Sequence, residues 1–154
     1  MTKPDPDNVD RAILRALQRD SSLSQRDLAD RVGLSQNACW RRLRILKDSG
    51  LIQSYTARLD QQALGLGLTV FVMLRTRHHS REWLEKFRSV VRSIPNVIDF
   101  YRIAGDYDYM LKVVAEDMNA YDRIYQRIIA EVELDTVTSY MTMEAIADQR
   151  DLPV

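Results

Sequence analysis

One stretch of the sequence, GLSQNACWRRLRILKDSG from Gly33 to Gly50, gathers side chains that can recognise nucleic-acid bases and phosphates. Between residues 36 and 49 it carries four cationic side chains and a single acidic one, Asp48. In the major groove of B-DNA, arginine can bridge O6 and N7 of guanine, and asparagine or glutamine can bridge N6 and N7 of adenine. Helices with a basic outer face are also common on ordinary proteins, so this stretch alone leaves both interpretations open.

The apolar residues of this stretch predict a helix that begins directly after Ser35. Serine is a favoured N-cap residue, because its hydroxyl accepts a hydrogen bond from a backbone N–H of the first turn. Cys39, Leu43 and Leu46 recur at i, i+4 and i+7, so they form a stripe that faces a core. Another face carries Gln36, Asn37, Trp40, Arg41, Arg44 and Lys47, with Arg42 close by. We interpret the segment as a recognition helix.

Two shorter helical patterns precede this helix. Asp7, with Asp10 three residues later, can begin a first helix, and Ser24 can begin a second helix that Gly33 ends. Their inward faces are formed by Val9, Ile13, Leu14 and Leu17, and by Leu28, Ala29 and Val32. Three helices with only residues 32–35 between the last two make a helix-turn-helix arrangement. This context favours DNA binding over a merely solvated helix face.

The segment after the recognition helix, residues 51–59, is rich in β-forming residues. It predicts a strand, and with it a winged variant in which a strand pair flanks the recognition helix and Arg58 reaches a phosphate. Residues 61–67 then form a hinge. These boundaries give a winged helix-turn-helix domain over 1–60, a linker over 61–67 and a second domain over 68–154.

The second half of the chain has the pattern of a different fold. Strands are predicted over 68–77, 97–104, 109–115 and 136–146, with helices capped by Ser80 and Asn119. The order βαββαβ is that of a ferredoxin-like α+β domain, in which both helices cover one face of the sheet. The other face also carries apolar residues, so we expect the sheets of two chains to pack together as a homodimer.

Composition limits the classes of protein that remain. The 154 residues are 45% hydrophobic and 29% charged, which is typical of a globular protein. Because no apolar run approaches the length of a membrane helix and the start of the chain lacks an apolar targeting region, we expect a cytoplasmic protein without membrane contact. Net charge is zero, but residues 1–60 hold 11 Lys and Arg against 8 Asp and Glu. The positive surplus therefore lies in the half with the recognition helix.

Few residues suggest metal or redox chemistry. Cys39 is the only cysteine, and its place on the apolar stripe favours burial over the alternative of a redox or metal-sensing thiol. His78 and His79 lack the neighbouring cysteines or carboxylates of a metal site. No nucleophile elbow or Gly-rich phosphate loop accompanies the Ser, His and Asp residues. We therefore expect no metal, no cofactor and no catalytic residues.

These elements together resemble a known family. The matching segments are NVDRAILRALQRD, LSQRDLADRVGLSQNACWRRLRILKDSGLIQSYTARLD, AGDYDYMLKV and TSYMTMEAI, within residues 7–150. They resemble the Lrp/AsnC family, the leucine-responsive and asparagine-responsive regulators of bacteria and archaea. The resemblance implies a transcription factor that forms homodimers, often assembled into octamers, and binds an amino acid or related molecule through its C-terminal domain. CWRRL, GLGLTVFV and TRHHSREW are similar to a subgroup linked to cysteine breakdown, which makes cysteine a candidate effector.

The resemblance also implies which residues contact DNA. The base-reading positions fall on Ser35, Gln36, Asn37, Trp40, Arg41 and Arg44. Lys47 and Arg58 fall among the phosphate partners, whereas Arg42 is either a phosphate partner or a structural arginine paired within the domain. Trp40 is large for a position facing the groove, so packing against the wing is an equal alternative.

The effector positions implied by the resemblance are Gly105, Asp106, Tyr107 and Asp108, together with Tyr140 and Thr142 on the last strand. An α-amino acid needs a carboxylate for its ammonium group, which Asp106 or Asp108 can supply, and N–H or hydroxyl donors for its own carboxylate. The alternative is that Gly-Asp-Tyr-Asp is only a hairpin built from turn-forming residues.

The leading hypothesis is a sequence-specific regulator that binds double-stranded DNA in response to an amino acid. Two alternatives belong to other classes. A dimeric α+β barrel enzyme would have no need of the first 60 residues, and an amino-acid sensor would act through another protein without touching DNA.

Overall fold

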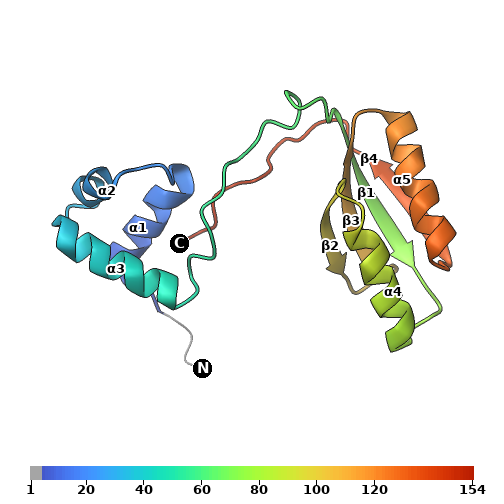
Figure 1. Cartoon of the computed structure of the whole chain (residues 1–154), viewed down its shortest axis with the longest axis horizontal. Helices are drawn as coiled ribbons and strands as arrows, with labels where there is room; N and C mark the ends of the chain where they lie inside the picture. Colours follow the sequence, from blue (N-terminus) through green and yellow to red (C-terminus); the bar gives the residue numbers. More distant parts are fainter. Residues whose placement is uncertain (1–4) are drawn as a thin grey trace. The chain divides into compact units, whose positions relative to one another are not determined.

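The computed structural model describes residues 5–154, which form two compact units (Figure 1). Unit 1 contains the residues up to Arg58 together with Ala147–Val154, and unit 2 contains Leu59–Ile146. The final segment therefore joins the N-terminal unit, which differs from the expected second domain over 68–154. The physical reason is apolar contact, because Val154 packs against the core of unit 1.

Unit 1 is built from three helices, α1 (Asn8–Arg19), α2 (Gln25–Arg31) and α3 (Gln36–Asp48). Each begins at its predicted cap, since the side chains of Asp7, Ser24 and Ser35 accept hydrogen bonds from backbone N–H groups of the first turn. Gly33 follows α2 with φ of 70°, as its role in ending that helix requires. The buried core consists of Ile13, Leu14, Ala16, Leu28, Ala29, Cys39, Leu43 and Leu46. The helix-turn-helix prediction is confirmed.

The predicted wing strand over 51–59 is not formed. Residues 51–60 have no regular secondary structure, and Ile52 makes the last backbone hydrogen bond of the region, to the carbonyl of Leu46. From 53 to 59, no backbone N–H donates to another residue of the chain that the structure describes. A β-forming sequence becomes a strand only when a second strand satisfies its backbone groups. Unit 1 supplies no such partner among the described residues.

Unit 2 has the predicted βαββαβ order: β1 (Leu68–Arg75), α4 (Arg81–Arg92), β2 (Val97–Arg102), β3 (Tyr109–Ala115), α5 (Met118–Glu131) and β4 (Thr136–Met141). The strands form one antiparallel sheet in the order β2-β3-β1-β4. Asp117, not the predicted Asn119, caps α5, because its carboxylate accepts from the Ala120 N–H at 2.7 Å. β1, β2 and β4 end earlier than predicted, and β4 stops at Met141, opposite Val70 near the start of β1.

The two faces of this sheet differ. Helices α4 and α5 cover one face (Figure 1) and enclose a core around Phe87, Leu111 and Val72. The open face carries Phe71, Met73, Tyr101, Met110, Thr138 and Tyr140, which are paired across the strands. Tyr101 and Tyr140 are about half exposed. Within residues 5–154, no helix is both long and apolar enough to cross a membrane.

Candidate DNA-binding surface and effector cluster

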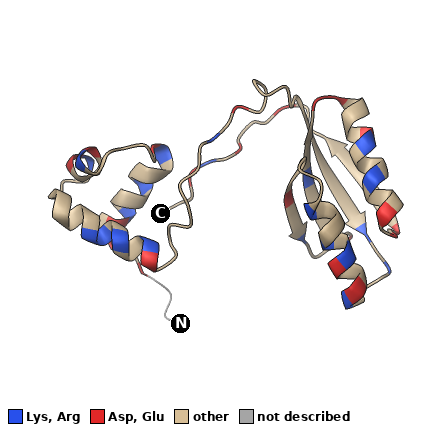
Figure 2. Ribbon diagram, viewed as in Figure 1, with Lys and Arg blue, Asp and Glu red and all other residues tan. Residues whose placement is uncertain are grey.

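Helix α3 presents its polar side chains to solvent. Because Cys39, Leu43 and Leu46 are buried in the core of unit 1, the other faces of the helix are left for Gln36, Asn37, Trp40, Arg41, Arg44 and Lys47, all of which are exposed. Figure 2 shows cationic residues in blue along α3, with acidic colouring in red at the end of the helix. Ser35 is also exposed, but its hydroxyl caps α3 by accepting a hydrogen bond from the Ala38 N–H. Burial raises the pKa of the Cys39 thiol, as expected of a core residue.

Trp40 lies at the centre of this surface and remains 48% exposed. The guanidinium carbon of Arg44 lies 5.7 Å from the centre of the Trp40 ring, within the range of a cation–π contact. Arg44 also lies 3.7 Å from a carboxylate oxygen of Asp48. The alternative that Trp40 packs against a wing loses its basis, because no strand forms over 51–60. Trp40 and Arg44 thus form one exposed pair on α3.

Arg42 is engaged within unit 1. Its Nη1 donates to Asp7 Oδ2 at 2.7 Å and to Asp10 Oδ1 at 2.8 Å. The two carboxylates also form the capping box of α1. The backbone N–H of Asp10 and then the Arg42 guanidinium hold the pKa of Asp7 below its usual value. Of the two roles left open for Arg42, the structure shows the structural one, in which α3 is joined to the start of α1.

The two remaining cations lie at and beyond the end of α3. Lys47 Nζ is 4.8 Å from the centre of the Tyr55 ring. Arg58 Nη2 lies 3.4 Å from Asp151 Oδ1, in the segment that returns to unit 1. Both cations are exposed, so both are accessible to a phosphate.

The predicted effector residues are only partly brought together. The Tyr107 hydroxyl lies 3.1 Å from Thr138 Oγ1 on β4, and a hydrogen bond with Tyr107 raises the pKa of Tyr140. Tyr107, Thr138 and Tyr140 thus form a cluster of hydroxyl groups at the open face, which we call the hydroxyl cluster. Thr138 is absent from the sequence prediction, although it lies two residues before Tyr140 and therefore on the same face of a strand.

Asp108 forms hydrogen bonds with the backbone at the end of β1. Its carboxylate accepts from the Thr76 N–H at 2.9 Å, and its own N–H donates to the carbonyl of Leu74. These bonds attach the β2–β3 hairpin to the end of β1. Asp106 is exposed and forms no ion pair with a described residue. Of the two candidate carboxylates, Asp108 thus has one oxygen engaged by the Thr76 N–H, whereas Asp106 is exposed and has no cationic partner among the described residues.

Gly105 leaves open space beside the hairpin. It has φ of 133°, and a Cβ built there would meet nothing within 4 Å. Thr142, in contrast, donates to the carbonyl of Thr69, five residues along β1 from Leu74. Five strand residues span about 17 Å. The structure therefore places Thr142 far from the β2–β3 hairpin, although Tyr140 lies only two residues before it along the chain.

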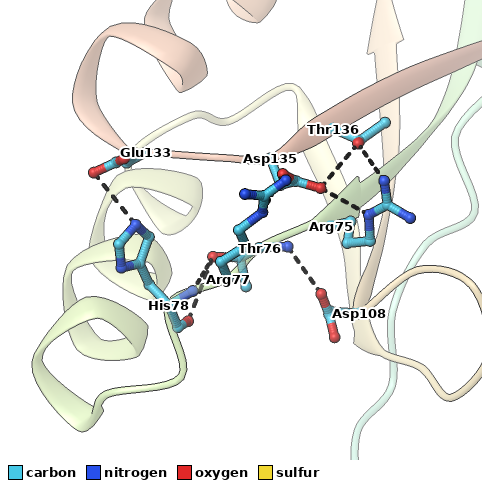
Figure 3. A network of polar contacts seen from close by, with 8 residues as sticks. All are labelled: Arg75, Thr76, Arg77, His78, Asp108, Glu133, Asp135 and Thr136. Atoms are coloured by element: carbon cyan, nitrogen blue, oxygen red, sulfur yellow. Dashed lines mark hydrogen bonds and ion pairs between the residues drawn. The ribbon is translucent and has the colours of Figure 1, made fainter.

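A second polar group that sequence reasoning missed lies where β1 leads into α4 (Figure 3). Asp135 lies 2.9 Å from Arg75 and 2.7 Å from Arg77, and His78 lies 3.4 Å from Glu133. Burial opposes ionisation of Asp135, but its hydrogen bond from Arg75 and the charges of the two arginines lower its pKa overall. These pairs join the ends of β1 and β4. Within residues 5–154, no three His, Cys, Asp or Glu side chains gather as metal ligands.

An exposed basic helix on a helix-turn-helix unit, followed by a βαββαβ unit with a polar cluster, defines a DNA-binding regulator with a ligand-binding domain. Comparison with known families agrees. Residues 6–53 match the model of winged helix-turn-helix DNA-binding domains, and residues 69–152 match the Lrp/AsnC ligand binding domain. The chain belongs to the Lrp/AsnC family of transcriptional regulators, as its sequence segments suggested.

Individual relatives support this assignment. The chain is 44% identical to the DNA-binding transcriptional activator DecR of Escherichia coli K12, over 96% of this chain and 98% of that protein. It is 42% identical to a glutamate uptake regulatory protein of Zymomonas mobilis, over 96% and 90% of the two chains. The crystal structure of an AsnC family regulator from Agrobacterium tumefaciens matches with a TM-score of 0.91 at 47% identity, covering 96% of each chain. A Neisseria meningitidis regulator in complex with L-methionine matches at 0.90 and 30% identity, again covering 96% of each.

Proposed function

We propose that this regulator reads double-stranded DNA through the exposed face of α3, as a homodimer whose DNA binding is set by an amino acid held near the β2–β3 hairpin. The observation that carries the first part is the division of α3 into a buried apolar stripe and an exposed basic face. In this proposal Gln36, Asn37, Trp40, Arg41 and Arg44 read bases, while Lys47 and Arg58 contact phosphates. Two copies would present two recognition helices to a roughly palindromic operator.

Binding to DNA from upstream of the protein's own gene, measured by fluorescence anisotropy with competitor DNA present, tests this proposal. Arg41→Ala and Arg44→Ala should each weaken specific binding by about 1 to 3 kcal/mol if the arginine bridges a guanine. Arg88→Ala is the matched control, because it removes one exposed positive charge from α4 in unit 2. Unchanged affinity in both α3 variants would reject the assignment.

The effector proposal rests on the hydroxyl cluster and on Asp106. Hydroxyl groups of Tyr107 and Tyr140 and the open backbone at Gly105 suit a carboxylate, and Asp106 suits an ammonium group. Relatives with an L-methionine complex and with a role in glutamate uptake support an amino acid as the ligand class. L-Methionine, L-glutamate and L-cysteine are therefore the first candidates.

Calorimetric titration with these three amino acids, followed by the remaining ones, tests the effector site. Asp106→Asn and Tyr107→Phe should weaken the binding of whichever amino acid the unaltered protein binds. Tyr125→Phe is the control, because it removes a tyrosine hydroxyl from α5 on the covered side of the sheet. If Asp106→Asn and Tyr107→Phe bind the amino acid as tightly as the control and the unaltered protein do, the effector site lies elsewhere in unit 2.

The enzyme and sensor alternatives receive less support. The relatives found are transcriptional regulators, so catalysis has no counterpart among them. A sensor that never touches DNA would not need an exposed basic face on α3. In this proposal the open sheet face binds a second copy of the chain, and assembly into octamers follows only from the family resemblance.

A further inference from the structure

The segment Ala147–Val154 is held on unit 1 by specific bonds. Gln18 on α1 exchanges two hydrogen bonds with the backbone of Leu152, donating to its carbonyl at 3.1 Å and accepting from its N–H at 2.7 Å. Arg15 donates to the carbonyl of Val154 at 2.7 Å. The side chain of Val154 packs against the core of the three helices. We call this segment the return segment.

The return segment brings a carboxylate to Arg58. Asp151 Oδ1 lies 3.4 Å from Arg58 Nη2, and Asp151 Oδ2 lies 4.0 Å from Arg19 Nε. The side chains of Arg58 and Asp151 are 57% and 38% exposed, so water screens the pair. A pair of this kind is weak, and the anion in it can be exchanged for another. A DNA phosphate is an anion that suits the same guanidinium.

We propose that the return segment is an intramolecular competitor of DNA, in which Asp151 occupies the guanidinium of Arg58 and a phosphate must displace it. This inference rests on the proposed function, which makes Arg58 a phosphate contact. The hydrogen bonds of Gln18 and the packing of Val154 keep Asp151 near Arg58, so the competitor is present at high local concentration.

The competitor is also tied to the effector unit. Only residues 142–146 separate the return segment from β4, which holds Thr138 and Tyr140 of the hydroxyl cluster. A chain of this length spans at most about 20 Å. In this proposal a ligand that displaces β4 changes how firmly Asp151 is held through this short covalent connection. This gives the effector a route to the affinity for DNA that leaves α3 itself unchanged.

The test compares Asp151→Asn with Asp148→Asn in the full chain. Both remove one negative charge from the return segment, but Asp148 forms no ion pair with a described residue. DNA affinity is measured by anisotropy at several salt concentrations, with the upstream DNA as probe. Asp151→Asn should bind about two- to five-fold tighter at low salt, and the slope of log K against log salt should steepen by about 0.9, the value of one added phosphate contact. Asp148→Asn should leave the slope unchanged.

Two further variants distinguish the effect of the Asp151 charge from the effect of holding the return segment on unit 1. Gln18→Ala removes both hydrogen bonds to Leu152 without changing charge, and it should also tighten binding. In an Arg58→Gln background, Asp151→Asn should no longer steepen the slope. Equal slopes for Asp151→Asn and Asp148→Asn, with clear DNA binding by the unaltered protein, would overturn the competitor and leave the proposed function standing. Failure of the unaltered protein to bind any DNA would reject both.

Discussion

A single carboxylate, Asp7, illustrates how much of unit 1 depends on charge at the level of one residue. It accepts hydrogen bonds from the backbone N–H groups of Val9 and Asp10, and it pairs with Arg42 on α3. The same atoms therefore cap one helix and join it to the helix proposed to read DNA. The lowered pKa of Asp7 means that the folded state favours its ionised form.

Asp7→Asn should flatten the acid dependence of the stability of unit 1. Because the pKa of Asp7 is lower in the folded state, its contribution is present above the usual carboxyl value of about 3.9 and is lost as pH falls through the folded value. Asparagine keeps the capping acceptor but loses the charge. Thermal unfolding followed by circular dichroism should show the variant less stable than the unaltered protein at pH 6, with the difference closing below about pH 4.

Asp30→Asn provides the control for this experiment, since the exposed Asp30 side chain makes no ion pair with a described residue. Its curve should run parallel to that of the unaltered protein. A gap between Asp7→Asn and the unaltered protein that is as wide at pH 3 as at pH 6 would contradict the charge argument and leave only a steric effect.

Residue types and spacing were sufficient to predict the caps at Asp7, Ser24 and Ser35, because capping is decided within four residues of chain. They were insufficient for Arg42, whose partners lie 32 and 35 residues away. The bond from the Thr76 N–H to the Asp108 carboxylate was not predictable either, since the two residues are 32 positions apart in the sequence.

At the level of elements, pairing decides what local propensity leaves open. Residues 51–59 are β-forming but have no partner strand among the described residues of unit 1, whereas the equally β-forming 109–115 lies between two strands and is formed as predicted. The order βαββαβ was predictable because each helix and strand carries its own apolar period. The ends of the strands were not predictable, because each depends on where the neighbouring strand stops.

Phe87 is the side chain that contributes most to the packing of α4 on the sheet. It is fully buried, and its ring lies 5.1 Å, between ring centres, from those of Trp83, Phe100 and Tyr109. Phe87→Ala should lower the free energy of unfolding of unit 2 by about 3 to 5 kcal/mol, through lost burial and the cavity left behind. Urea unfolding followed by the fluorescence of Trp83, in a Trp40→Phe background, reports this unit alone.

Arg88→Ala, one position further along α4, is exposed and should change the same free energy by no more than about 0.5 kcal/mol. A loss below about 1 kcal/mol in Phe87→Ala would mean that the aromatic cluster reorganises and is not the centre of the core.

At the level of the whole molecule, the open sheet face is a partly apolar surface that neither α4 nor α5 covers. Met110 lies on β3 between Met73 and Tyr101, so it occupies the middle of this face. Met110→Lys would place a charge where the second sheet is proposed to pack. Sedimentation velocity should show the variant as a smaller species than the unaltered protein at the same concentration.

Ile129→Lys is the matched control, because Ile129 is a partly exposed apolar residue on α5, away from the open face. It should sediment like the unaltered protein. If Met110→Lys also does so, the assembly of this regulator uses a different surface.

The return of Ala147–Val154 to unit 1 has a consequence for how the DNA-binding part can be isolated. A fragment that stops at Arg58 contains all three helices but lacks Val154, which packs on their core, and Leu152, which bonds to Gln18. The melting temperature and operator affinity of this fragment would therefore differ from those of the same helices in the full chain. Conversely, a protease that cuts once between residues 59 and 67 leaves the DNA-binding part held to the other fragment by the return segment, so the two fragments should elute together under native conditions and separate in denaturant.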